Sequence, residues 1–137
     1  MVRVVVDTNV LVSAFLNRGK SRKVVACLLE KHSVILSPQL LAELADVLSR
    51  EKFGATNSQI ERYISILIRQ AKVVPAQAKF KIVLEDPDDD VVINTALTGK
   101  ANYIVSGDKH LLKLACYKRI QIVPISEMEK IIAEKNR

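Results

Sequence analysis

Three aspartates stand where one predicted element ends and the next begins. Asp7 directly follows the apolar run at residues 3–6, Asp108 follows the run at 103–105, and Asp90 precedes the apolar residues of a helical pattern. In a doubly wound parallel sheet such junctions face one edge, where ligands bind, so we expect these carboxylates to converge. Aspartate is also a common helix N-cap, and for each residue alone that structural interpretation stays open.

A fourth carboxylate, Glu43, lies in a helical pattern whose apolar leucines span residues 40–48. On a projection at about 100° per residue, Glu43 falls roughly 60° from Leu40, at the edge of the buried arc. Asp46 falls about twice as far away. We therefore expect Glu43 to lean inward and Asp46 to face solvent, and a glutamate at the boundary of the core, without a chemical role, is the alternative for Glu43.

Carboxylates that converge among apolar residues repel one another, and a divalent cation removes that repulsion. The chain has only two cysteines and two histidines, far apart in sequence, so a metal site must use oxygen ligands. Oxygen ligands favour Mg²⁺ or Mn²⁺ over zinc. Such an ion activates a bound water and stabilises charge on a phosphorus centre under attack. The pattern thus predicts metal-assisted hydrolysis of a phosphodiester.

The elements that would position these residues alternate between strands and helices. Short β-branched runs predict strands at residues 3–6, 33–36, 72–74, 103–105 and 120–123. Helical spacing predicts helices at 38–48, 60–68, 92–97, 111–114 and 125–132, the third of them closed by Gly99. This alternation indicates an α/β fold with a parallel sheet covered on both faces, and it leaves the strand order open.

The length and composition favour one globular domain over residues 1–137. The chain is 49% hydrophobic and 26% charged, which excludes a disordered protein. Its apolar runs are far shorter than the 20 or so residues that a membrane span needs. An acid at Asp7 interrupts the first run before a signal-peptide core can form. We therefore expect a cytoplasmic protein that does not enter the membrane.

The charge balance favours a polyanionic partner. Twenty-one basic and fifteen acidic residues give a formal charge of +6, which attracts nucleic acid. One run without acids contains Arg18, Lys20, Arg22 and Lys23. We expect this run to contact an RNA backbone, and a solvated basic loop is the alternative.

The ordered motifs resemble those of the PIN-domain ribonucleases, in particular the single-domain PIN toxins of prokaryotic toxin–antitoxin pairs. Residues 5–11, VVDTNVL, resemble the family's first strand and its D-T-N-V/I motif. Residues 86–93, DPDDDVVI, with Ala96, and residues 103–108, YIVSGD, resemble its second conserved block. Ser106 stands where threonine is commoner in the family, and it keeps the hydroxyl.

The resemblance implies a three-layer α/β/α sandwich around a parallel sheet, often dimeric, with an antitoxin as partner and RNA as substrate. It implies that Asp7, Glu43, Asp90 and Asp108 bind Mg²⁺ or Mn²⁺ and form the catalytic centre. Asn9 and Ser106 would orient these carboxylates from behind. The alignment of residues 88–90 with the family motif leaves open whether Asp89 or Asp90 is the main metal ligand. If Asp90 is the ligand, Asp89 would support the site from a neighbouring position.

Two other interpretations remain. A haloacid-dehalogenase-like phosphatase also carries an aspartate after its first strand, but the second acid of its D-x-D motif would fall on Asn9. A PIN fold that binds RNA or protein with little catalysis would keep the same carboxylates. Metal-dependent cleavage of single-stranded RNA separates this binding module from a nuclease.

Overall fold

A six-stranded sheet forms the centre of the molecule, seen in a computed structural model that describes residues 1–75 and 87–135, with the backbone alone for residues 87–90. Its strands are β1 (Arg3–Val6), β2 (Ser33–Leu36), β3 (Lys72–Val73), β4 (Tyr103–Val105), β5 (Cys116–Tyr117) and β6 (Ile120–Val123). They lie in the order β3-β2-β1-β4-β6-β5, and only the edge strand β5 pairs antiparallel. The predicted parallel sheet is confirmed, and β5 is an addition that the sequence pattern did not predict.

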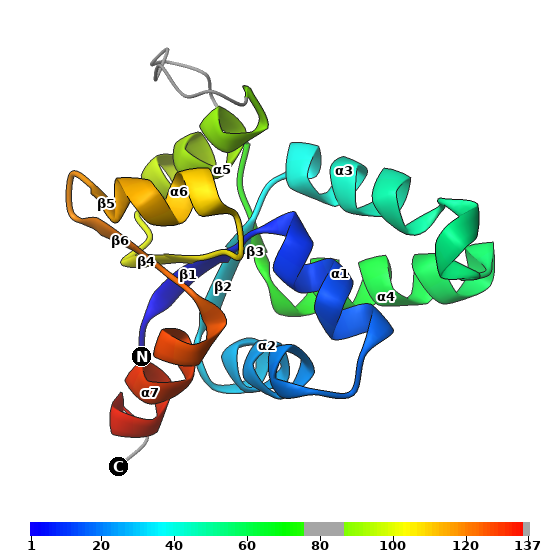
Figure 1. The fold of residues 1–137 in the computed structure, drawn as a ribbon, viewed down its shortest axis with the longest axis horizontal. Helices are drawn as coiled ribbons and strands as arrows, with labels where there is room; N and C mark the ends of the chain where they lie inside the picture. Colours follow the sequence, from blue (N-terminus) through cyan, green and yellow to red (C-terminus); the bar gives the residue numbers. More distant parts are fainter. Residues whose placement is uncertain (76–86, 136–137) are drawn as a thin grey trace.

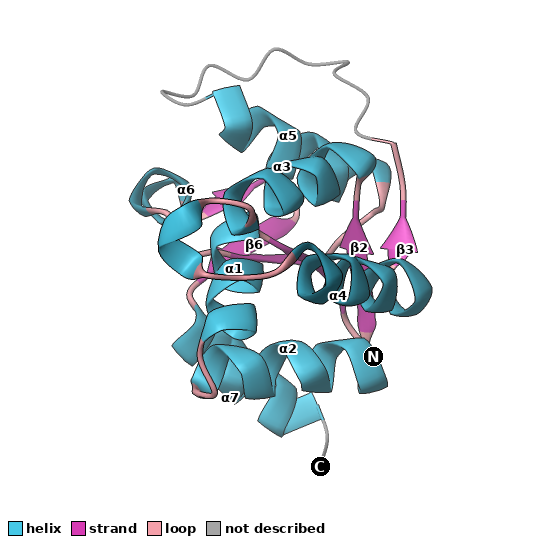
Figure 2. Ribbon diagram, turned by 90° about the vertical axis from the view of Figure 1, so that its right-hand side faces the viewer, coloured by secondary structure: helices cyan, strands magenta, loops and turns pink. Residues whose placement is uncertain are grey.

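Helices cover both faces of this sheet. They are α1 (Thr8–Leu16), α2 (Lys20–Lys31), α3 (Pro38–Leu48), α4 (Asn57–Gln70), α5 (Pro87–Thr98), α6 (Lys109–Leu114) and α7 (Ile125–Lys135), with a 3₁₀ turn, η1, at Glu51–Phe53. In Figure 1, α5 and α6 lie on one side of the strands and α2 and α7 on the other. Figure 2 shows α3 beside α5, and α4 packs next to α3. The three-layer α/β/α arrangement is therefore confirmed.

Local signals explain where several helices begin and end. Ser37 caps α3 by accepting a hydrogen bond from the Leu40 amide at 3.3 Å, with Pro38 in the first turn, as predicted. Helix α5 ends at Thr98, immediately before Gly99. Gly99 is needed for close packing, because a Cβ there would lie 2.5 Å from Ile35 Cγ2. After α5 the left-handed backbone falls on Lys100, whose φ is 55°, and not on Gly99.

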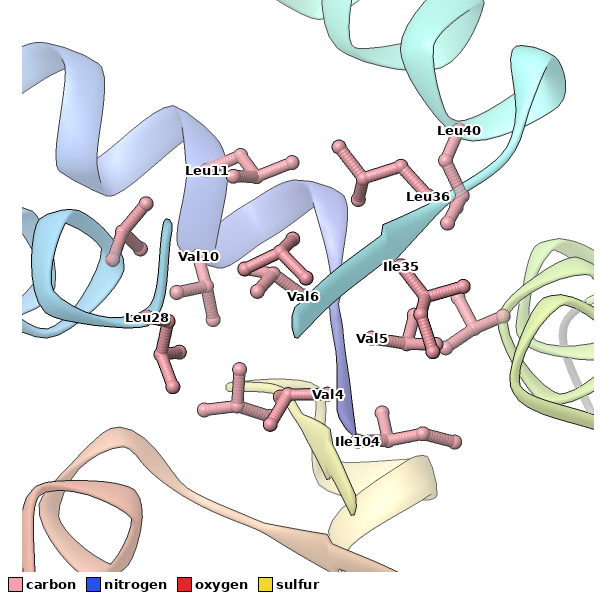
Figure 3. Packing of buried hydrophobic residues seen from close by; sticks show 14 of the residues in the cluster. Val4, Val5, Val6, Val10, Leu11, Leu28, Ile35, Leu36, Leu40 and Ile104 are labelled. Atoms are coloured by element: carbon pink, nitrogen blue, oxygen red, sulfur yellow. The ribbon is translucent and has the colours of Figure 1, made fainter. Parts of the chain in front are cut away.

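The apolar core forms on both faces of the central strand β1. Val4, Val5 and Val6 have no exposed surface, as expected for a strand buried on both sides. Figure 3 shows Val5 beside Ile35 near α5, and Val4 and Val6 on the side of α1 and α2, where Leu28 lies. Complete burial of each such side chain contributes about 1.5–3 kcal/mol, so β1 is held firmly in place.

The order of the strands also fixes where a ligand site can form. From β1 the chain pairs first with β2 on one side and later with β4 on the other. A crevice at the carboxyl ends of the strands is expected at such a change of direction. Asp7 follows β1 and Ser106 follows β4 at this edge. Among the described helices, none combines the length and apolar character that crossing a bilayer requires.

Candidate metal centre

Asp7 lies at the centre of the candidate site and is only 7% exposed. It is the N-cap of α1, and its Oδ1 accepts a hydrogen bond from the Thr8 amide at 2.7 Å. Its Oδ2 accepts one from the Ser106 hydroxyl at 2.6 Å and a longer one from the Asn9 side-chain amide at 3.4 Å. These three hydrogen bonds orient the Asp7 carboxylate at the end of β1.

Ser106 connects the end of β1 to the loop after β4. Its hydroxyl donates to Asp7 and accepts a hydrogen bond from the Asp108 amide at 2.9 Å, while its side chain is buried. Asn9 makes a second connection, because its Oδ1 accepts a hydrogen bond from the Gly107 amide at 3.2 Å. Ser106 and Asn9 therefore link Asp7 to the loop that carries Asp108.

Asp108 begins α6 as its N-cap. Its Oδ1 accepts hydrogen bonds from the amides of His110 at 2.8 Å and Leu111 at 3.3 Å. In the described part of the chain, its Oδ2 accepts none. The side chain is half-buried, so this second oxygen can face a ligand while the first holds the helix.

Glu43 joins the same cluster through Thr8. The Thr8 hydroxyl donates to Glu43 Oε2 at 3.4 Å, and Thr8 is buried beside Asp7. Glu43 is half-buried, whereas Asp46 is exposed, so both predicted orientations on α3 are confirmed. The role of Thr8 was not foreseen, although its place between Asp7 and Asn9 in the first motif was a signal.

The remaining acidic candidates, Asp89 and Asp90, occupy the first turn of α5, and their side chains lie outside the described part of the structure. The helix that carries them packs against β1, β2, β4 and α3. It is joined to the start of α3 by the buried hydroxyls of Thr95 and Ser37, which lie 3.0 Å apart. Helices α3 and α5, which carry Glu43 and Asp90, thus pack against each other.

The side-chain atoms in this cluster that could bind a metal are carboxylate oxygens, and hydroxyl and amide groups hold them in place. Such oxygen ligands suit a hard cation such as Mg²⁺ or Mn²⁺. Within the described side chains, no three His, Cys, Asp or Glu groups approach closely enough to hold one ion together. The residues fit a metal site in chemical type. A complete set of ligands requires either a further carboxylate from α5 or water between the metal and a side chain.

The predicted RNA-binding run lies elsewhere, on the first turn of α2 and the loop before it. The Arg22 guanidinium donates to the carbonyls of Ala14 at 2.7 Å and Phe15 at 2.6 Å, which closes the end of α1. Lys20 lies 3.8 Å from Glu129 of α7. Because α1 leads away from Asp7, Ala14 is about 10 Å along its axis from the carboxylate.

An open groove of about 820 Å³ lies at this same end of α1, among α1, α2, η1 and α4. Tyr63 lines it and donates a hydrogen bond to the Leu11 carbonyl at 2.8 Å. Burial raises the pKa of the Tyr63 phenol well above its usual value, and the charge of Arg22 opposes this only in part. The groove contains none of the carboxylates described above.

Comparison with known proteins gives a family match over most of the chain. Residues 3–110 match a family described as PIN domain. The uncharacterized protein MJ1680 of Methanocaldococcus jannaschii is 29% identical over 124 residues, which cover 82% of this chain and 75% of that protein.

Two solved structures share the fold. One is VapBC2 from Rickettsia felis bound to a DNA fragment from its promoter, with a TM-score of 0.63, 15% identity, and coverage of 89% of this chain and 98% of that one. The other is VapBC-1 from nontypeable Haemophilus influenzae, with a TM-score of 0.61, 18% identity, and coverage of 90% and 98%. The family match spans most of the sequence and includes Asp7, Asn9, Glu43, Ser106 and Asp108. This chain therefore belongs to the PIN-domain family, whose members are generally nucleases.

Proposed function

We propose that this chain is an endoribonuclease that depends on Mg²⁺ or Mn²⁺ and hydrolyses phosphodiester bonds of RNA. One observation carries the proposal: the buried Ser106 hydroxyl contacts both Asp7 and the amide of Asp108, so acids 101 residues apart in sequence share one edge of the sheet. A helix cap needs no such connection to a second acidic residue. The oxygen-only donor set supports a divalent cation.

Asp7, Asp108, Glu43 and Asp90 are the proposed metal ligands and catalytic residues, with Asp89 as the alternative to Asp90. When bound, the metal would supply a nucleophilic hydroxide near neutral pH and a positive charge that stabilises the leaving oxygen. Asp7 is oriented by Ser106 and Asn9, and Glu43 by Thr8. These hydrogen bonds fix the directions of the carboxylates before any ligand arrives, which reduces the cost of ordering the site.

Asn9 argues against the phosphatase alternative. In a D-x-D phosphatase this position would supply an acid. Here its amide donates toward Asp7 and accepts from Gly107, so it holds two loops together. A neutral amide engaged at both ends cannot donate a proton to a leaving group, which leaves the nuclease and the catalytically weak binding module as candidates.

We further propose that the chain is the toxin of a toxin–antitoxin pair, acts in the cytoplasm and forms a homodimer. The two VapBC structures support a protein partner, since both share this fold over nearly the whole length of their matched chains. A small neighbouring gene whose product copurifies with this chain and suppresses its cleavage of RNA would support the pairing. A product that neither binds nor inhibits would contradict it.

A matched pair of variants on α3 tests the nuclease proposal. The purified chain should cleave single-stranded RNA with Mn²⁺ and stop when EDTA removes the metal. Glu43→Gln should lower kcat by about 100-fold or more, because it replaces a negatively charged metal ligand with a neutral amide. Asp46 lies on the same helix with an exposed side chain. The Asp46→Asn variant should therefore cleave RNA with a kcat within about twofold of the unchanged protein.

The binding module makes the opposite prediction. If the unchanged protein binds RNA but does not cleave it with Mg²⁺ or Mn²⁺, catalysis is excluded and binding remains. If Glu43→Gln and Asp46→Asn cleave equally well, Glu43 is not part of the centre.

A further inference from the structure

The segment that follows Asp108 carries only positive formal charge over a long stretch. From Lys109 to Ser126 it contains no aspartate or glutamate, while it contains Lys109, Lys113, Lys118 and Arg119. All four side chains are exposed. The cation-bearing segment therefore starts directly beside one of the proposed metal ligands.

Helix α6 orders two of these charges. Lys109 and Lys113 are four residues apart and thus neighbours on one helical face, about 6 Å apart along the axis. Leu111, on another face of the helix, is buried, and α6 packs against β6. In the described part of the chain neither lysine has a carboxylate within 4 Å. Lys118 and Arg119 continue the positive charge at the turn between β5 and β6.

A nuclease centre made of carboxylates repels the phosphates of its substrate, so cations nearby must hold the backbone in place. The run at Arg18–Lys23 is poorly placed for this. Arg22 is engaged by the carbonyls at the end of α1, and Lys20 lies beside Glu129. Lys109, by contrast, is the residue next to Asp108.

We infer that single-stranded RNA leaves the carboxylate centre along the exposed face of α6, with its phosphates on Lys109 and Lys113. This inference rests on the proposed ribonuclease function and specifies where its substrate lies. Contacts of this kind give affinity without reading the bases. The chain's low aromatic content, 4%, agrees with a path that depends on charge more than on base stacking.

Two double variants of the full chain test the path, because each removes two exposed positive charges. One is Lys109→Ser with Lys113→Ser, and the other is Arg18→Ser with Lys23→Ser. Binding of a fluorescent single-stranded RNA is measured in EDTA between 0.05 and 0.5 M salt, so that cleavage does not interfere. Cleavage with Mn²⁺ is measured separately, and thermal unfolding verifies that both variants fold.

Loss of two phosphate contacts on a single strand should flatten the slope of log K against log[salt] by about 1.4. We expect this for the α6 variant, together with a raised KM and a kcat within about twofold of the unchanged protein. The variant at residues 18 and 23 should keep its slope within about 0.5. Lys109→Arg with Lys113→Arg, which keeps both charges, should retain the original slope.

Two results would overturn the inference while leaving the proposed function intact. One is an unchanged slope for the α6 variant in a protein that still binds and cleaves RNA. The other is a flattened slope for the variant at residues 18 and 23 alone, which would return the path to α2. If the unchanged protein neither binds nor cleaves single-stranded RNA, the proposed function itself fails.

Discussion

Replacement of Ser106 by alanine tests whether one hydroxyl holds the two halves of the candidate site together. The variant loses a hydrogen bond to the Asp7 carboxylate at 2.6 Å and one from the Asp108 amide at 2.9 Å. A hydrogen bond to a charged partner contributes about 1.5–3 kcal/mol and a neutral one about 0.5–1.5 kcal/mol. Because the side chain is 1% exposed, water cannot easily replace either partner.

We therefore expect Ser106→Ala to lower the free energy of unfolding in EDTA by about 2–4 kcal/mol. With a urea m-value of about 2 kcal/mol/M, the midpoint should fall by about 1–2 M. If the proposed metal role is correct, Mn²⁺ affinity measured by calorimetry should also fall about 10- to 100-fold, as is usual when a group that orients a ligand is removed.

Ser37→Ala is the matched control for this change. Ser37 is also a buried serine that follows a strand, but its partners are the Leu40 amide and the Thr95 hydroxyl, not a carboxylate. Its loss should cost about 1–2 kcal/mol, as for other N-cap serines, and leave Mn²⁺ affinity within about twofold. A free energy of unfolding for Ser106→Ala within 0.5 kcal/mol of that of the unchanged protein would refute the bridging role. Equal metal affinity in the two variants would refute the link to the metal.

Three further changes probe the surrounding fold. Arg22→Ala should lower the free energy of unfolding by about 1–3 kcal/mol, because two carbonyls at the end of α1 lose a charged donor, and exposed Lys23→Ala should change it by less than 0.5 in the same urea titration. Gly99→Ala should cost about 1–3 kcal/mol, since its methyl group would overlap the buried Ile35 side chain. Burial raises the pKa of Tyr63 in the folded protein, so the unfolded chain releases this proton at a lower pH. The free energy of unfolding should therefore fall above about pH 10, by up to 1.4 kcal/mol per pH unit, and Tyr63→Phe should remove this dependence.

The parallel sheet could be predicted because its strands are short, fully buried runs separated by helical patterns. Val4, Val5 and Val6 have no exposed surface, and a continuous apolar run is the expected pattern for such a strand. Strand β5 could not be found this way, since Cys116 and Tyr117 are only two residues, and they form a strand by pairing with β6 at the sheet edge. Tertiary pairing decided their conformation.

Helix α2 was missed although its sequence held a signal. Val24, Val25 and Leu28 form a buried stripe at helical spacing. The preceding Gly19 caps the helix without a side-chain hydrogen bond, so the usual marker of a helix start is absent. The charge of the basic run predicted contact with RNA, but the Arg22 guanidinium donates hydrogen bonds to two backbone carbonyls of α1. A sequence cannot show such a contact until the ends of α1 and α2 are brought together.

The positions of Asp7 and Asp108 were more predictable than those of the basic residues because they follow from the fold class. Asp7 and Asp108 follow β1 and β4, which are neighbours in the sheet, and the adjacency of carboxyl ends follows from parallel pairing. The half-buried position of Glu43 followed from its helical projection. The placement of cations on exposed long side chains follows no comparable rule, so the sequence offered no ground to prefer Lys109 and Lys113 over the run at residues 18–23.

Helix capping is compatible with the metal binding proposed for these aspartates, although the sequence presents the two as alternatives. Asp108 uses Oδ1 for the amides at the start of α6, and its Oδ2 accepts no hydrogen bond in the described part of the chain. Asp7 differs, because hydrogen bonds reach both of its oxygens, from the Thr8 amide at Oδ1 and from the Ser106 hydroxyl at Oδ2. Amide donors and the positive end of a helix stabilise a carboxylate anion. In the proposed site, the caps would offset part of the repulsion among the acids and would let the protein fold before a cation binds.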